Sequence, residues 1–133
     1  MTKVGEISRA DFEEQFDEMF TKKADVYKTI VILDNKIDQV IGAGSLIIER
    51  KFIRQLGSCG HIEDIVVRDG YRGKHLGLKI IEALKKLAWE NKCYKVILDC
   101  SKDNVGFYEK NGFKVKEVQM VLYASEQETP SKL

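Results

Sequence analysis

The sequence predicts an α/β domain in which helices pack on a central mixed, twisted β-sheet. Apolar residues recur at helical spacing in two separate stretches, and β-branched runs bounded by turn residues lie between and after them. The expected order is helix, three strands, helix, strand, short helix, strand. A meander that feeds a strand–helix–strand unit produces a sheet with both antiparallel and parallel neighbours.

The composition is that of a globular domain. Of 133 residues, 44% are hydrophobic and 32% are charged, which argues against disorder. We expect one domain over residues 1–123 and a flexible polar tail over residues 124–133. The net charge is +1, so no overall field attracts nucleic acid and any anion site must be local. No apolar run reaches the roughly 18 residues that a membrane span needs, and we expect no membrane insertion.

The first helix is expected over about residues 9–23. Ser8 and Asp11 resemble an N-terminal cap. Lysines near the end of this stretch suit the negative end of a helix dipole. The apolar side chains at helical spacing are aromatic residues and one methionine: Phe12, Phe16, Met19 and Phe20.

A β-hairpin should follow the first helix. Residues 26–33 are rich in β-branched side chains, residues 34–36 supply turn chemistry, and residues 37–49 resume the β-prone run. Gly42 and Gly44 inside the second strand indicate a bulge or a close approach of another backbone or side chain.

The third strand is expected over residues 60–68 and the strongest helix over residues 74–91. Residues 94–100 form a short apolar run without alternation, as in a strand covered on both faces. The apolar positions of the long helix trace one face: Leu76, Ile80, Ile81, Leu84, Leu87 and Ala88.

The C-terminal part should contain a short helix and a last strand. Asn104 is placed to cap a helix that ends at Lys110, and Gly112 is placed to close it in the left-handed conformation. Residues 115–123 alternate between apolar and polar side chains, which is typical of a strand.

A basic turn, residues 72–77, connects the third strand to the long helix. Gly73 and Gly77 let the backbone turn tightly, while Arg72 and Lys74 add positive charge beside the positive end of the helix dipole. Amides at a helix start bind anions, so we expect a local pyrophosphate site. The P-loop pattern GxxxxGK[ST] and the dinucleotide pattern GxGxxG are both absent. On the residues alone, a solvated helix cap is the alternative.

Four longer blocks of the sequence carry a family resemblance. They are IERKFI at 48–53, GHIEDIVV at 60–67, CYKVILDC at 93–100 and NVGFYEKNGF at 104–113. Together with the basic turn, these blocks resemble the glucosamine-6-phosphate N-acetyltransferase family of the GNAT superfamily, over about residues 2–123. The resemblance implies the GNAT fold, without the first strand and helix that such enzymes usually have.

The resemblance implies acetyl-CoA as the cosubstrate. Its pantetheine arm would bind the main chain of a strand that splays from its neighbour. His75 stands where the motif has its first glycine, and we expect its amide to serve if the local φ is negative. The implied coenzyme-binding residues are Ile65, Val66, Val67, Arg72, Gly73, Lys74, His75, Leu76, Gly77, Asn104 and Tyr108.

The implied reaction is direct attack of the amine of glucosamine 6-phosphate on the thioester, a step of UDP-N-acetylglucosamine biosynthesis. Tyr108 matches a tyrosine beside the coenzyme sulfur. A phenol, with a pKa of about 10, keeps its proton at neutral pH and can give it to a thiolate whose thiol has a pKa of about 8.5. Glu63 and Asp99 are candidates to orient the amine or accept its proton, directly or through water. Asp64 is either a sugar ligand or a structural hydrogen-bond acceptor.

The resemblance also places cations at the sugar phosphate. Lys51, Arg54 and Lys95 match positions that line that pocket, with Tyr94 beside Lys95. Tyr123 stands where relatives supply a phosphate-binding arginine across the dimer, so binding would rest on these cations or on Lys3.

Family members are homodimers whose C-terminal strands cross. Val118, Met120 and Leu122 suit such an interface. A partner subunit or an upstream segment would also cover the sheet edge left by the missing first strand.

The cysteines argue against a metal site. Cys59, Cys93 and Cys100 are odd in number and lack CxxC spacing, and only His61 and His75 accompany them. We therefore expect core thiols in a reducing compartment and no metal.

The chain ends in Ser131-Lys132-Leu133, the tripeptide read by the peroxisomal import receptor. This predicts import into a peroxisome-type organelle, glycosomes included. Coincidence, with the protein in the cytoplasm, is the alternative.

Two further functions fit parts of the pattern. A GNAT enzyme acting on another amine, such as a protein terminus, a polyamine or an aminoglycoside, explains everything except the cations. A non-catalytic acyl-CoA-binding module explains the basic turn but leaves Tyr108 and Glu63 without a role.

Overall fold

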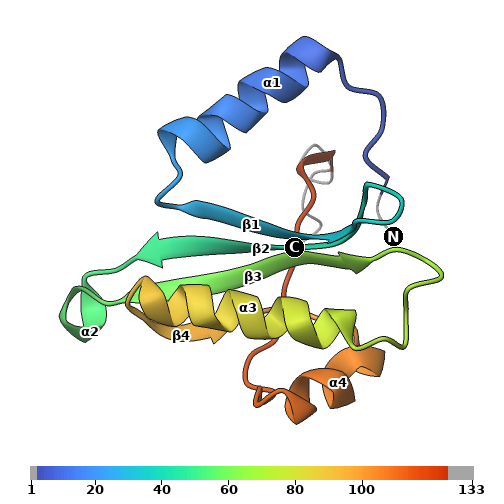
Figure 1. Ribbon diagram of the computed structural model, residues 1–133. Helices are drawn as coiled ribbons and strands as arrows, with labels where there is room; N and C mark the ends of the chain where they lie inside the picture. Colours follow the sequence, from blue (N-terminus) through green and yellow to red (C-terminus); the bar gives the residue numbers. More distant parts are fainter. Residues whose placement is uncertain (1–2, 126–133) are drawn as a thin grey trace. The chain divides into compact units, whose positions relative to one another are not determined.

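The structure is a computed structural model that describes residues 3–125 (Figure 1). The Ser131-Lys132-Leu133 signal lies outside the described residues. The chain separates into two compact units, Met1–Leu98 and Asp99–Leu133, and each is described by itself.

The first unit contains a mixed four-stranded sheet in the order β1-β2-β3-β4, as the sequence predicts. The β1–β2 and β2–β3 pairs are antiparallel, and the β3–β4 pair is parallel. β1 forms one edge of this sheet. The elements of the unit are α1 (Arg9–Asp17), η1 (Glu18–Lys22), β1 (Tyr27–Asp34), β2 (Gln39–Arg50), α2 (Ile53–Leu56), β3 (Ser58–Val67), α3 (Leu76–Glu90) and β4 (Cys93–Ile97).

The N-terminal helix begins at the predicted cap. The Ser8 hydroxyl accepts a hydrogen bond from the Asp11 amide at 3.0 Å, which satisfies one amide of the first turn. The helix ends in the π-helical turn η1. Phe12 and Phe16 remain 53% and 51% exposed, so the predicted aromatic stripe forms without being buried.

The two glycines of β2 mark both features that the sequence predicts there. An ideal Cβ at Gly44 would lie 2.5 Å from Ile80 Cγ2, so α3 approaches the β2 backbone very closely. The β2–β3 register also shifts between Ala43 and Ser45. The absence of a side chain at Gly44 is what leaves room for α3 to lie directly on the sheet.

The core lies between α3 and the face of the sheet that it covers. The predicted apolar face of α3 supplies its buried side chains, and β2 and β3 supply the facing ones (Figure 1). Packing of this apolar stripe provides most of the helix's stability. The buried residues of this core include Leu46, Ile48, Ile62, Ile80, Ile81, Leu84 and Ala88.

Two details of the first unit differ from expectation. The prediction that both faces of the fourth strand are covered is wrong: Lys95 and Ile97 are exposed, and the strand ends at Ile97. β4 stands at one edge of the described sheet. An apolar composition alone therefore does not show whether both faces of a strand are covered. α2 was not predicted, because Arg54, Gln55 and Leu56 adopt φ of 56°, 57° and 63° without any glycine to signal a left-handed turn.

The second unit contains η2 (Lys102–Asn104) and α4 (Val105–Lys110). Gly112 closes α4 at φ 91°, as predicted. The predicted Asn104 cap is wrong, because this residue is itself in a right-handed helical conformation that continues from η2, and its side chain makes no capping bond.

The last predicted strand is also wrong for the described residues. Residues 113–123 have no assigned secondary structure, and Val118 and Met120 are 87% and 91% exposed. Alternating side chains specify two faces, but a strand also needs a neighbouring backbone to pair with. No strand in residues 3–125 pairs with this segment.

Candidate active site

β3 separates from β4 halfway along its length. The parallel ladder runs from Ser58–Cys93 to His61–Ile97 and stops there. β3 continues to Val67 with β2 as its only partner in the described chain. The main chain of Ile65, Val66 and Val67 therefore presents unpaired strand edge on the β4 side, where an extended ligand can add. This is the splay that the sequence prediction requires.

The same part of β3 carries a β-bulge at the predicted substrate carboxylates. Ser45 pairs with Glu63 and Ala43 pairs with Val66, so β3 has one more residue than β2 in this interval. Asp64 lies in the bulge at φ 54°. Bulges redirect side chains next to binding sites. Glu63 and Asp64 are both exposed, so water removes the desolvation cost that a buried carboxylate would carry.

The turn after β3 leads into an uncapped helix N-terminus. The first intrahelical bond of α3 runs from the Lys79 amide to the His75 carbonyl at 3.1 Å, and His75 makes no side-chain capping bond. The amides of Leu76, Gly77 and Leu78 therefore have no partner within the helix. Such a set of amides at the positive end of a helix dipole suits a pyrophosphate.

His75 corrects one condition of the sequence analysis. The His75 amide was expected to serve the coenzyme if the local φ is negative, and the structure does not meet this condition, with φ 57° and ψ 24°. The left-handed conformation is the one that a glycine would adopt without strain at this motif position. The backbone at His75 thus has the left-handed conformation that glycine adopts easily, although histidine disfavours it. This conformation directs the chain into α3.

The cations of the turn are only loosely engaged. Arg72 Nη2 lies 3.2 Å from Asp69 Oδ1, but the two side chains are 69% and 89% exposed, and such surface pairs contribute little. Lys74 Nζ lies 5.2 Å from the centre of the Tyr71 ring. Both cations are thus available to an anionic ligand.

Tyr71 is a residue of this loop that the sequence analysis missed. Its hydroxyl donates a 2.7 Å hydrogen bond to Asp34 Oδ2, at the end of β1. This bond raises the pKa of Tyr71 and, together with the Lys36 amide, lowers the pKa of Asp34. The loop is thereby tied to the β1–β2 hairpin. No sequence signal joins residues so far apart in the chain.

The predicted phosphate-binding cations gather around Tyr94. Arg54 Cζ and Lys95 Nζ lie 5.7 and 5.6 Å from the centre of the Tyr94 ring. Lys51 Nζ lies 3.3 Å from Glu49 Oε1. The Lys51 amide donates a hydrogen bond to the Gly57 carbonyl at 3.1 Å, and an ideal Cβ at Gly57 would lie 3.0 Å from Tyr94 Cδ1, so Lys51 belongs to the same end of the sheet. The structure thus brings four of the predicted substrate residues to one end of the first unit.

In the second unit, Asp99 and Gln119 are linked. Gln119 Nε2 donates a 2.8 Å hydrogen bond to Asp99 Oδ2, which holds the carboxylate of the candidate base in one orientation. The alternation of residues 115–123 pointed to Gln119 only as a strand position, so its role was missed. Asn104 lies exposed at the start of α4.

Tyr108 lies on α4 with its ring packed edge-on against Phe107 and Phe113, at centroid distances of 5.0 and 5.9 Å. Burial raises the pKa of its phenol, and Cys100 adds to the shift. The hydroxyl therefore stays protonated at neutral pH, as a proton donor requires. Cys100 itself is exposed. The prediction of a third core thiol is wrong because this residue lies beyond the end of β4.

These features agree with a comparison against known proteins. A family model described as the acetyltransferase (GNAT) family matches residues 2–113. The chain belongs to this family. It is 52% identical over 132 residues to glucosamine 6-phosphate N-acetyltransferase 1 of Dictyostelium discoideum, covering 96% of this chain and 82% of that one. It is 47% identical over 121 residues to glucosamine 6-phosphate N-acetyltransferase of Candida albicans, covering 91% and 80%.

The fold of this GNAT protein is also that of a solved relative. The crystal structure of glucosamine-6-phosphate N-acetyltransferase from Arabidopsis thaliana has a TM-score of 0.88 and 41% identity to it, over 92% of this chain and 83% of that one. Within residues 3–125 of the GNAT protein, no helix has both the length and the apolar character of a membrane span.

Proposed function

We propose that this protein transfers the acetyl group of acetyl-CoA to the amine of glucosamine 6-phosphate. The observation that carries the proposal is the free edge of β3 at Ile65–Val67, which runs directly into the uncapped start of α3. A strand edge followed by a helix N-terminus offers main-chain partners to the pantetheine arm and then to the pyrophosphate. Relatives at 41–52% identity carry this activity in their names.

The chemistry requires little from side chains. The neutral amine attacks the thioester carbonyl, the tetrahedral intermediate collapses, and the thiolate leaves with a proton. Tyr108 supplies that proton, because burial raises the pKa of its phenol and keeps the donor protonated. One carboxylate, either Asp99, which is oriented by Gln119, or Glu63, receives the amine proton, directly or through water.

The sugar phosphate is the part of the substrate that the cations recognise. Arg54 and Lys95 lie 5.7 and 5.6 Å from the centre of the Tyr94 ring, at a distance where cation–π attraction favours this grouping. Lys51 extends the positive group along the end of β2. These cations favour an amino sugar that carries a phosphate over an amine without one. They therefore favour the proposed substrate over the amines of other GNAT enzymes.

Release of free thiol from acetyl-CoA, measured against a panel of amines, tests the proposal. The panel contains glucosamine 6-phosphate, glucosamine, a polyamine, an aminoglycoside and a peptide with a free N-terminus. Turnover with glucosamine 6-phosphate at a kcat/KM at least about 100-fold above glucosamine is expected, since the loss of several charge-assisted contacts costs about 3 kcal/mol or more. Turnover only with another amine contradicts the substrate, and coenzyme binding without turnover contradicts the enzyme.

Two assembly and targeting proposals accompany this function. The segment with Val118, Met120 and Leu122, which are 87%, 91% and 66% exposed, joins two copies into a homodimer. Sedimentation equilibrium of the protein and of its Met120→Asp variant tests this, with a monomeric wild-type protein as the contrary outcome.

The Ser131-Lys132-Leu133 end directs the protein through the import receptor to a peroxisome-type organelle. Unchanged organelle fractionation after its deletion would contradict that route.

A further inference from the structure

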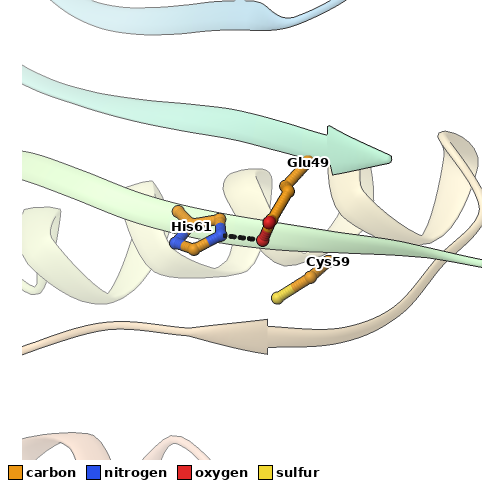
Figure 2. A group of neighbouring side chains, drawn as sticks. All are labelled: Glu49, Cys59 and His61. Atoms are coloured by element: carbon orange, nitrogen blue, oxygen red, sulfur yellow. Dashed lines mark hydrogen bonds and ion pairs between the residues drawn. The ribbon is translucent and has the colours of Figure 1, made fainter. Parts of the chain in front are cut away.

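Glu49, Cys59 and His61 meet on the sheet face opposite α3. One potential ligand atom of each residue lies within 4.8 Å of those of the other two (Figure 2). Cys59 is buried, His61 is half-buried and Glu49 is exposed. The group is therefore anchored at its sulfur and open toward solvent on its carboxylate side.

The strand register explains why residues separated in the sequence meet here. Glu49 of β2 pairs directly with Cys59 of β3, and directly opposed residues point to the same face. His61 follows Cys59 by two positions, so its side chain also lies on that face. The sequence analysis found no metal pattern because it considered spacing along one chain segment, whereas this group is formed across a ladder.

The donor set matches a known class of metal ligand. Thiolate, imidazole and carboxylate together are typical of zinc sites, and three protein ligands leave a fourth tetrahedral position open. The group in its metal-free form is held by ordinary contacts: His61 Nε2 lies 2.9 Å and Lys51 Nζ lies 3.3 Å from Glu49 Oε1. A metal ion would bind the Glu49 Oε1 and His61 Nε2 atoms themselves, and its positive charge would displace the Lys51 ammonium from Glu49.

We propose that Glu49, Cys59 and His61 form a binding site for a zinc-class divalent metal ion, separate from the chemistry of acetyl transfer. Occupancy breaks the Glu49–Lys51 ion pair and so releases Lys51, one of the cations proposed for the sugar phosphate. The site thereby links metal binding to the end of the sheet where the substrate phosphate is expected. This link depends on the proposed function, whereas the metal site itself does not.

The Cys59 sulfur would bind a metal ion as the thiolate, so the thiol proton is released to solvent when the ion binds.

Binding of Co²⁺ to the tag-free, chelator-treated protein tests the proposal. Cobalt replaces zinc in such sites and shows a thiolate-to-cobalt charge-transfer band when a cysteine is bound. We expect this band at one ion per chain, its displacement by Zn²⁺, and its loss in Cys59→Ser. Glu49→Gln and His61→Ala should each weaken Zn²⁺ binding by about tenfold or more, measured by competition with a chromophoric chelator.

Matched controls use residues of the same type outside the group. Cys100→Ser and His75→Ala should leave the band and the affinity unchanged. Because Glu49 is exposed, Glu49→Gln keeps the test valid even where Cys59→Ser destabilises the fold. No band with wild-type protein, or equal zinc affinity in wild type and all three site variants, would overturn the proposal. Acetyl transfer in the presence of a chelator is measured in parallel, so that failure of the metal site is not confused with failure of the enzyme.

Discussion

The close approach of α3 to β2 makes Gly44 the position where one added methyl group has the clearest consequence. An ideal Cβ at residue 44 would lie 2.5 Å from Ile80 Cγ2 and 3.1 Å from Leu84 Cδ1, whereas carbon atoms in contact prefer about 3.5–4.0 Å. Ile80 and Leu84 are fully buried at 0% exposure, so neither side chain can turn away into solvent. In Gly44→Ala the helix itself must move.

The size of the effect follows from this overlap. Overpacking of a well-packed core typically costs about 1–3 kcal/mol. For a domain of this size, each kcal/mol lowers Tm by about 3–5 °C, so Gly44→Ala should lower Tm by about 3–15 °C. Since α3 begins at the turn proposed to bind the coenzyme, its displacement should also raise the KM for acetyl-CoA. Calorimetry and steady-state kinetics measure the two effects.

A double-mutant cycle with Ile80→Ala assigns the cost to this one contact. Removing the Ile80 side chain costs about 2–5 kcal/mol by itself, but it also makes room for the methyl group at residue 44. In that background Gly44→Ala should cost nothing or should stabilise. Gly106→Ala is the control, because nothing lies within 4 Å of a Cβ there, and alanine in a helix is favoured over glycine by about 0.5–1 kcal/mol. An equal cost of Gly44→Ala in both backgrounds would refute the reasoning.

Three further predictions concern the candidate site. Tyr108→Phe should lower kcat on the order of 10–1000-fold with little change in acetyl-CoA affinity, because it removes the proton donor; an unchanged kcat in steady-state assays would remove that role. His75→Gly should raise Tm by a few degrees, because it relieves a left-handed φ of 57° that costs a non-glycine residue about 1–3 kcal/mol, offset in part by glycine entropy; a lower Tm would show that the histidine side chain matters more than its backbone. The Tyr71–Asp34 bond lowers the pKa of Asp34, so its contribution to stability is present above the carboxyl pKa of the unfolded chain and is lost as pH falls through the lower folded value. Tyr71→Phe should therefore lose less stability on acidification than the wild-type protein, as followed by urea denaturation; equal losses would contradict the linkage.

The sequence was sufficient where the signal was local. Ser8 marked the start of α1, the apolar spacing from Leu76 to Ala88 marked α3, and Gly112 marked the end of α4, because capping, periodicity and left-handed turns depend only on nearby residues. The glycines of the basic turn likewise indicated a tight turn into a helix, and Gly73 has a φ of 81° just before α3. Each of these features would look the same in any protein with the same short segment.

The prediction failed where a neighbour in space decides the outcome. Alternation over residues 115–123 indicated a strand, but no ladder in the described chain pairs with it. The apolar run at residues 94–100 indicated a strand covered on both faces, but the side chains of Lys95 and Ile97 are exposed. The spacing of the cysteines also could not show that the β2–β3 register places Glu49 and His61 beside Cys59.

The sequence by itself determined the helices α1, α3 and α4, the hairpin, the turn into α3 and the family to which the chain belongs. Only the tertiary structure decided where β3 leaves β4, that Tyr71 is held by Asp34, and which side chains share the face of Glu49. The physical reason is the range of the interactions. Helix caps and turns are set by bonds within a few residues, whereas sheet register and its bulges are set by pairing between strands, and a shift of one residue exchanges every side chain between the two faces.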